Sequence, residues 1–225
     1  MKSSLSRLLR SLALVPVFTS AIAFANPSAE STSGPTPDAA LRLLLEGNQR
    51  FIQGTVRHPH QTADRRKETS TGQAPFAVVL TCADSRLSPE IVFDQGLGDL
   101  FVVRNAGNLL SDHVIGSIEY AVEHLHAPLI VVMGHTRCGA VAAAVAGGEA
   151  GGHVQSIVNS LALVVAAARA RGGDTTDQAE QINARMSADA LAASDPVLAK
   201  AVAAGKLKVV GARYNLATGA VELLP

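Results

Sequence analysis

Two short segments of the sequence concentrate side chains that bind metal ions. The first holds Cys82, with Asp84 and Arg86 soon after it, and the second holds His135 and Cys138. Two thiolates and one imidazole can serve as the three protein ligands of a catalytic zinc site, which keeps its fourth tetrahedral position for water or substrate. The residue types and their spacing therefore predict a zinc site built by Cys82, His135 and Cys138.

The chemistry of such a site follows from the charge of the ion. Zinc lowers the pKa of a bound water molecule enough that hydroxide is available near neutral pH. Asp84 can accept a hydrogen bond from this water and orient it, while Arg86 can hold the Asp84 carboxylate in a bidentate ion pair. If the pair opens, Asp84 can itself take the fourth position and close the site. We therefore expect Asp84 and Arg86 to be catalytic, with Asp84 as an alternative metal ligand.

Apolar runs predict an α/β fold that brings the two segments together. Four runs are typical of buried parallel strands, namely 76–80, 100–103, 129–133 and 207–210. Helical patterns lie between or after them, at 112–126, 138–146, 154–170, 178–192 and from Pro196, with Asp195 as its cap, to a stop at Gly205. Cys82 follows the first run and His135 follows the third. Because ligand sites lie beyond the carboxyl ends of parallel strands, we expect a mainly parallel central sheet, flanked by helices, with the metal site at this edge.

The beginning of the chain is predicted to be processed. Residues 1–25 combine basic side chains with an apolar run that ends in Ala23-Phe24-Ala25, as a cleaved secretory signal peptide does. The run is short and interrupted by polar residues, which disfavours a membrane anchor. Residues 26–37, rich in Ser, Thr, Pro and Gly, predict a flexible leader. We therefore expect an exported, periplasmic protein.

The segment after the leader predicts an N-terminal helical arm. Asp38 can cap a helix over 38–53, with apolar residues near helical spacing and Gly54 as its stop. Residues 55–73 are polar, show no apolar periodicity and predict an arm or loop.

Composition limits the function classes. The 225 residues are 48% hydrophobic, 17% charged and 4% aromatic, a profile typical of a soluble α/β protein, and we assign residues 38–225 to one domain. The formal net charge is zero, and no basic stripe is interleaved with aromatic residues, so nucleic acid is not expected as a partner. No second long apolar segment suggests contact with a membrane once the signal is removed. A small-molecule substrate fits best.

The two cysteines also permit a non-catalytic interpretation. Exported proteins normally keep thiols as disulfides, and Cys82 and Cys138 are the only cysteines of the sequence. They could form a disulfide, or hold zinc, in a structural protein. The charges of Asp84 and Arg86 favour an active site, because burying such groups costs free energy that a structural role does not require.

The two metal-binding segments resemble the β class of carbonic anhydrases. Two motifs carry the likeness, Cys82-Ala83-Asp84-Ser85-Arg86 and Gly134-His135-Thr136-Arg137-Cys138-Gly139, and further matching stretches lie at 47–51, 102–108, 116–122 and 210–214. The resemblance implies zinc on Cys82, His135 and Cys138 with the Asp84/Arg86 pair at the water. It also implies the reversible hydration of carbon dioxide to bicarbonate and a proton.

The resemblance further implies a substrate pocket and an assembly. Gln73 would donate its side-chain amide to the substrate from a neighbouring subunit, and Phe101 and Tyr120 would form apolar walls. The family forms homodimers and higher homo-oligomers, with the helix over 38–53 reaching over the partner. The chain has no Trp, so the bicarbonate regulation that some bacterial members build on a tryptophan is not expected. The sequence leaves open a zinc hydrolase that acts on a carbon dioxide analogue, such as a sulfur analogue.

Overall fold

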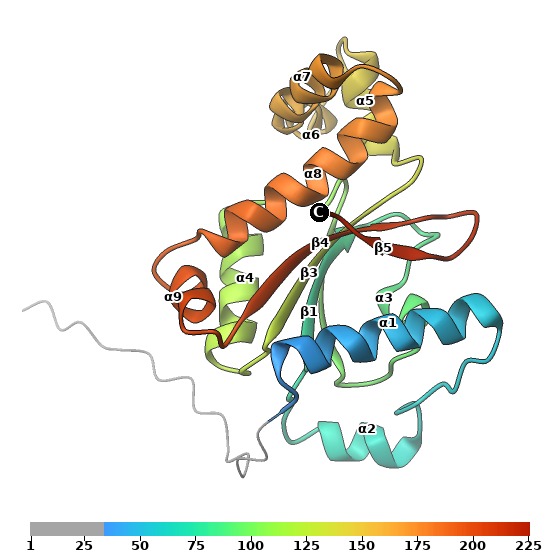
Figure 1. The fold of residues 1–225 in the computed structure, drawn as a ribbon, viewed down its shortest axis with the longest axis vertical. Helices are drawn as coiled ribbons and strands as arrows, with labels where there is room; N and C mark the ends of the chain where they lie inside the picture. Colours follow the sequence, from blue (N-terminus) through green and yellow to red (C-terminus); the bar gives the residue numbers. More distant parts are fainter. Residues whose placement is uncertain (1–33) are drawn as a thin grey trace, which may run out of the picture.

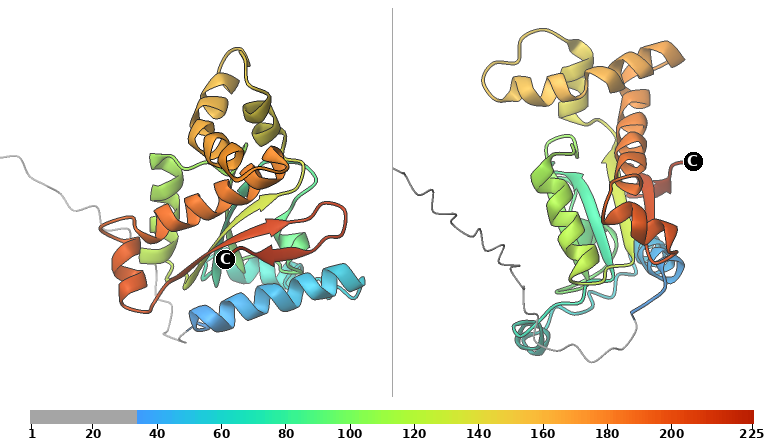
Figure 2. Two further views of the ribbon diagram at one scale, coloured as in Figure 1. Left: turned by 45° about the horizontal axis from the view of Figure 1, so that its top comes forward. Right: turned by 90° about the vertical axis from the view of Figure 1, so that its left-hand side faces the viewer.

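The computed structural model describes residues 34–225 and shows a five-stranded sheet with helices packed against it (Figures 1 and 2). The sheet order is β2-β1-β3-β4-β5, in which the first four strands are parallel and β5 is antiparallel to β4. The strand bounds are β1 (Ala77–Cys82), β2 (Leu100–Asn105), β3 (Leu129–His135), β4 (Lys208–Tyr214) and β5 (Val221–Leu223). The predicted mainly parallel sheet is confirmed. The predicted signal peptide and most of the predicted leader lie outside the described residues.

Helices connect the parallel strands, and some of these helices form a separate layer beyond the carboxyl ends of the strands. Their bounds are α1 (Pro37–Gln53), α2 (Ala63–Thr69), α3 (Pro89–Val92), α4 (Asp112–Glu123), α5 (Gly139–Ala146), α6 (Val154–Ser160), α7 (Ala162–Arg171), α8 (Thr175–Ala192) and α9 (Leu198–Ala203). Figure 1 shows α5, α6 and α7 gathered beyond the carboxyl ends of the strands, with α8 running from them across the sheet.

Alternate residues of β1 and β3 point into two different apolar clusters, as the period of a strand requires. Val78 and Leu80 pack with residues of α4, α8 and α9. Ala77 and Val79 pack with residues of α1 and α3. A third cluster joins both cysteines to α5, α7 and the first half of α8, so the predicted metal site lies where the strands end and the upper helices begin.

Helix α1 is fixed to its own chain. Ala40 and Leu44 are fully buried against the sheet. The Asn48 side chain donates to the carbonyls of Val92 and Gly219, at 3.1 and 2.8 Å, and accepts the N–H of Val221 at 2.9 Å. The helix therefore packs on this chain's sheet, and additional contact with a partner stays a prediction.

Several predicted element boundaries were wrong, for local reasons. The segment 55–73 contains α2, which is capped by Thr62 and buries none of its side chains. The predicted helix over 154–170 is two helices that break at Leu161. Helix α1 is capped by Thr36 rather than Asp38, and α8 is capped by Asp174, four residues before its predicted start.

Near the C-terminus, α9 begins at Leu198 without a side-chain cap, although Asp195 was predicted to cap a helix from Pro196. The short elements α3 and β5 were not predicted.

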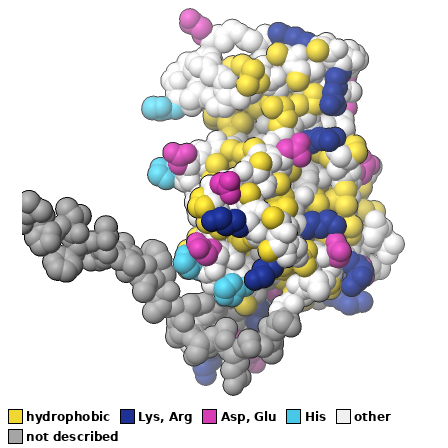
Figure 3. All heavy atoms as spheres, turned by 60° about the vertical axis from the view of Figure 1, so that its left-hand side comes forward, with side chains coloured by type: hydrophobic (Ala, Val, Ile, Leu, Met, Phe, Trp, Pro, Cys, Tyr) yellow, Lys and Arg dark blue, Asp and Glu magenta, His cyan; other side chains and the backbone are white. Residues whose placement is uncertain are grey.

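Figure 3 shows acidic side chains and histidines interspersed with lysines and arginines on one face of the molecule. None of the helices within residues 34–225 combines the length and the apolar character needed to cross a bilayer.

Candidate metal centre

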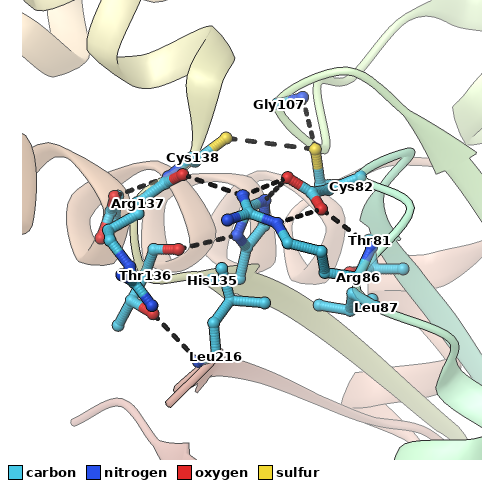
Figure 4. A network of polar contacts seen from close by, with 12 residues as sticks. Thr81, Cys82, Arg86, Leu87, Gly107, His135, Thr136, Arg137, Cys138 and Leu216 are labelled. Carbon is cyan, nitrogen blue, oxygen red and sulfur yellow. Dashed lines mark hydrogen bonds and ion pairs between the residues drawn. The ribbon is translucent and has the colours of Figure 1, made fainter.

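The three predicted zinc ligands converge at the carboxyl ends of two neighbouring strands (Figure 4). Cys82 is the last residue of β1, His135 is the last residue of β3, and Cys138 precedes α5 as its N-cap residue. All three are buried, and their ligand atoms lie within 4.8 Å of one another. The fold therefore brings together side chains that lie 56 residues apart in the sequence.

The distance between the two sulfurs fits a shared metal ion and not a disulfide. The Cys82 and Cys138 Sγ atoms are 4.0 Å apart, and both cysteines are free. A disulfide would need about 2.05 Å. Two Zn–S bonds of about 2.3 Å at a tetrahedral angle place the sulfurs about 3.8 Å apart. Cys82 and Cys138 therefore do not form a disulfide in this structure.

His135 presents one ring nitrogen for coordination. Its Nδ1 lies 3.0 Å from the Thr136 carbonyl, which can only accept, so Nδ1 carries the proton and Nε2 has the free lone pair. Nε2 is buried and has no hydrogen-bond partner among the described residues. Leaving a buried polar atom unpaired is costly, so a cation between this nitrogen and the two sulfurs fits the site.

The electrostatics of the site already favour one thiolate. The hydrogen bond from Cys138 holds the pKa of the Cys82 thiol well below its usual range, and His135 and the Gly107 N–H lower it further. The same hydrogen bond, together with burial, raises the pKa of the Cys138 thiol. Burial opposes a charge on His135, but its contact with Cys82 and the Thr136 carbonyl raises its pKa overall. A divalent cation would replace the protons that the three groups share.

Asp84 and Arg86 form the predicted bidentate pair beside the ligands. Arg86 donates through Nε to Asp84 Oδ1 at 2.9 Å and through a terminal nitrogen to Oδ2 at 2.7 Å. These bonds hold the pKa of the Asp84 carboxyl well below its usual range. Asp84 Oδ2 lies 3.9 Å from His135 Nε2, so the carboxylate faces the ligand atoms while both of its oxygens are engaged. Its service as a fourth metal ligand stays a prediction.

Arg104, which carried no predicted role, fixes the loop after Cys82. Its guanidinium donates to the carbonyls of Cys82, Asp84 and Leu87 at 3.1, 2.8 and 2.8 Å. One sequence signal for it existed. Arg104 and Asn105 end an apolar strand, paired with Thr81 and Cys82, and polar residues at that edge of a sheet are candidates for a site.

Two asparagines, also missed, aim a backbone amide at Cys82. Asn105 bonds the N–H and carbonyl of Leu109 at 2.7 and 2.8 Å, and Asn183 donates to the Gly107 carbonyl at 2.8 Å. Between these anchors the Gly107 N–H lies 3.3 Å from the Cys82 sulfur. Gly107 has φ of 79°, which favours glycine.

The predicted substrate residues do not meet the ligands within one chain. Phe101 pairs with Val78 in the register of β2 and β1, four residues before Asn105, which pairs with Cys82. Four residues span about 13 Å along a strand. The rings of Phe101 and Tyr120 lie 6.4 Å apart, and the exposed Gln73 precedes β1. All three belong to the amino end of the sheet.

Comparisons with known proteins agree with this geometry. A sequence model described as carbonic anhydrase matches residues 77–221. The chain is 45% identical to carbonic anhydrase 2 of Mycobacterium tuberculosis over 191 residues, which are 83% of this chain and 92% of that protein. Its fold is similar to a tetrameric β-carbonic anhydrase from Sordaria macrospora, with a TM-score of 0.66 and 26% identity over 82% of this chain and 96% of that one. It is also similar to the Coccomyxa β-carbonic anhydrase in complex with acetazolamide, with a TM-score of 0.63 and 30% identity over 82% and 86% of the two chains.

Proposed function

The chain belongs to the β class of the carbonic anhydrase family, and on this premise we propose that it hydrates carbon dioxide reversibly with zinc held by Cys82, His135 and Cys138. The products are bicarbonate and a proton. The observation that carries this conclusion is the convergence of two sulfurs and one unpaired imidazole nitrogen within 4.8 Å. Zinc in this ligand set acidifies a water molecule, an effect best known from carbonic anhydrases with three histidine ligands, and so supplies the nucleophile.

Asp84 is the residue that orients the nucleophile. Arg86 donates to both carboxylate oxygens, which keeps Asp84 ionised and therefore able only to accept a hydrogen bond. With Oδ2 only 3.9 Å from His135 Nε2, the acceptor lies beside the ligand atoms. Should the pair with Arg86 open, Asp84 is free to turn toward the metal and block it.

The substrate side of the site comes from a second copy of the chain. Carbon dioxide has no dipole and requires a small dry cavity, whereas bicarbonate requires one or two donors. Phe101 and Tyr120 supply apolar walls and Gln73 supplies an amide donor, all from the amino end of the partner's sheet. A two-fold dimer is self-complementary, so one such contact completes two sites. The tetrameric state of the Sordaria relatives supports a homodimer or a higher homo-oligomer.

The protein is a bacterial one exported to the periplasm, where residues 1–25 are removed as a signal peptide. The apolar run and its small-residue end support this proposal. Zinc on both thiolates would protect them from oxidation in that compartment. N-terminal sequencing of the protein from a periplasmic fraction checks it, and a chain that still begins at Met1 contradicts it.

Metal analysis and activity assays test the proposed function. Purified protein should contain close to one zinc per chain and hydrate carbon dioxide in a stopped-flow assay. A panel that includes carbon disulfide and carbonyl sulfide distinguishes the closest alternative. Turnover of a sulfur analogue without hydration of carbon dioxide would reverse the assignment while keeping the metal.

A further inference from the structure

A buried carboxylate outside the catalytic set lies against a metal ligand. Glu180, on α8, is 3% exposed, and its Oε1 accepts the backbone N–H of Cys138 at 2.9 Å. Its Oε2 lies 3.2 Å from a terminal nitrogen of Arg213, which also pairs with Asp177. A carboxylate so deeply buried is expensive unless each oxygen has a specific partner, and here one of those partners is the backbone of a zinc ligand.

Two glycines allow Glu180 to reach this position. A side chain on Gly134 would put its Cβ 3.1 Å from the Glu180 carbonyl and 3.4 Å from the Cβ of Ala184. A Cβ on Gly211 would lie 3.3 Å from the Cα of Arg185. Gly134 immediately precedes His135 and pairs with Arg213 in the register of β3 and β4. The close approach of α8 is therefore built into the same strands that carry the site.

The backbone that carries Cys138 needs such a contact. Arg137 has φ of 56°, an unfavourable conformation for a residue other than glycine. Cys138 follows in an extended conformation and makes no side-chain cap bond to α5. Two side chains hold the peptide between Arg137 and Cys138: Arg86 donates to the Arg137 carbonyl at a long 3.4 Å, whereas Glu180 accepts the Cys138 N–H at 2.9 Å. Glu180 thus makes the shorter of the two side-chain contacts to the peptide that joins Arg137 to Cys138.

We propose that Glu180, held by Arg213, is a positioning residue that fixes the Cys138 thiolate for zinc and so sets the affinity of the site for the metal. This inference rests on the proposed function. Outer contacts that orient a metal ligand typically contribute 10–100-fold to metal affinity. The alternative is that the carboxylate only pins α8 to the sheet.

Zinc affinity, measured by chelator competition on the full-length chain, tests the proposal. In Glu180→Ala the Cys138 N–H loses its acceptor, and we expect the zinc Kd to rise by 10–100-fold. In Glu180→Gln an amide oxygen can still accept that N–H, but the amide NH2 then faces the Arg213 guanidinium, so a rise of about tenfold is expected. The matched control is Asp177→Asn, which removes the charge of the other Arg213 partner on the same helix and should change Kd by less than about threefold.

Thermal unfolding of the zinc-free proteins separates positioning from packing. A positioning role predicts that the Glu180 variants lose more zinc affinity than Asp177→Asn even where their zinc-free Tm values match. If Glu180→Ala does not fold, zinc affinity and zinc-free Tm are compared between Glu180→Gln and Asp177→Asn. If the wild type binds zinc and the Glu180 variants bind it equally well, the positioning role of Glu180 is overturned and the proposed metal site is not. A wild type that takes up no zinc overturns the proposed metal site itself.

Discussion

The two ends of the central sheet differ in what a single chain can accomplish there. At the carboxyl end, three buried ligand atoms lie within 4.8 Å, and Arg104 and Glu180 fix the loops that carry them. At the amino end, Phe101 lies four residues along its strand from the partner of Cys82, and the 36% exposed Tyr120 has its ring 6.4 Å from the Phe101 ring. One chain therefore brings the three candidate metal ligands together, whereas the groups proposed to orient the substrate would act only across an assembly. Metal binding and turnover should respond differently to changes at the two ends.

The largest effect should come from removing a ligand at the carboxyl end. Cys138→Ser should bind little zinc and lose carbon dioxide hydration by more than about 100-fold, since outer contacts alone are worth 10–100-fold. Metal analysis and stopped-flow hydration check this. The zinc-free Tm should match that of zinc-free wild type, because the serine fills the same space. A variant that keeps zinc and activity would exclude Cys138 as a ligand.

The next largest effect should separate turnover from metal binding at the same end. In Asp84→Asn the amide cannot pair through two oxygens with Arg86 and cannot orient the nucleophile as a carboxylate does. Zinc content should stay close to that of wild type, while kcat/KM falls by about 100-fold, the low end for proton-transfer and orienting groups. Unchanged kcat/KM would leave Asp84 with a structural role only.

A smaller effect should come from the amino end, and it should act in trans. Gln73→Ala removes one donor to bicarbonate, so activity should fall by about tenfold, because a hydrogen bond to a charged acceptor contributes at least about 1.5 kcal/mol. A mixed dimer of Gln73→Ala and Cys138→Ser chains, purified through two tags, has one site with both zinc and Gln73. It should recover about half of the wild-type activity. If Gln73 served its own chain, the mixed dimer would stay near the activity of the separate variants.

The smallest effect should be on stability in acid. The Arg86 bond lowers the folded-state pKa of Asp84 below its unfolded value. This pair therefore stabilises the fold fully above a pH of about 4 and loses that contribution as the pH falls through the lowered pKa. Arg86→Gln should have a slightly lower Tm than wild type at pH 7, and the difference should shrink toward pH 3. A Tm difference that grows as the pH falls would contradict a lowered pKa of Asp84 in the folded state.

The sheet and the ligands could be predicted because they combine strong local signals. Every residue of β1 and β3 is buried, so each strand contains a continuous apolar run, and the strands end at Cys82 and His135. Helix α2 buries no residue, so the sequence carries no apolar period for it. Leu161 is fully buried between α6 and α7, and the apolar pattern therefore continued through the break.

The contacts of the supporting residues could not be predicted because they join groups that are distant in sequence. Arg104 reaches the Cys82 carbonyl 22 residues away, Glu180 reaches Cys138 across 42 residues, and Asn183 reaches Gly107 across 76. A periodic pattern reports which face of an element is buried and not which polar group meets which backbone amide. The proposed division of the site between the two ends of the sheet likewise depends on strand register, which places Phe101 four residues before the pair formed by Asn105 and Cys82.

Zinc reconstitution tests the zinc-dependent function most directly. Protein stripped of metal by a chelator should not hydrate carbon dioxide, and activity should return in proportion to added zinc until one ion is bound per chain. The same titration on Cys138→Ser should restore nothing. Full hydration activity in the metal-free protein would contradict a reaction that depends on these three ligands. Equal recovery of activity by zinc in Cys138→Ser and in wild type would contradict it as well.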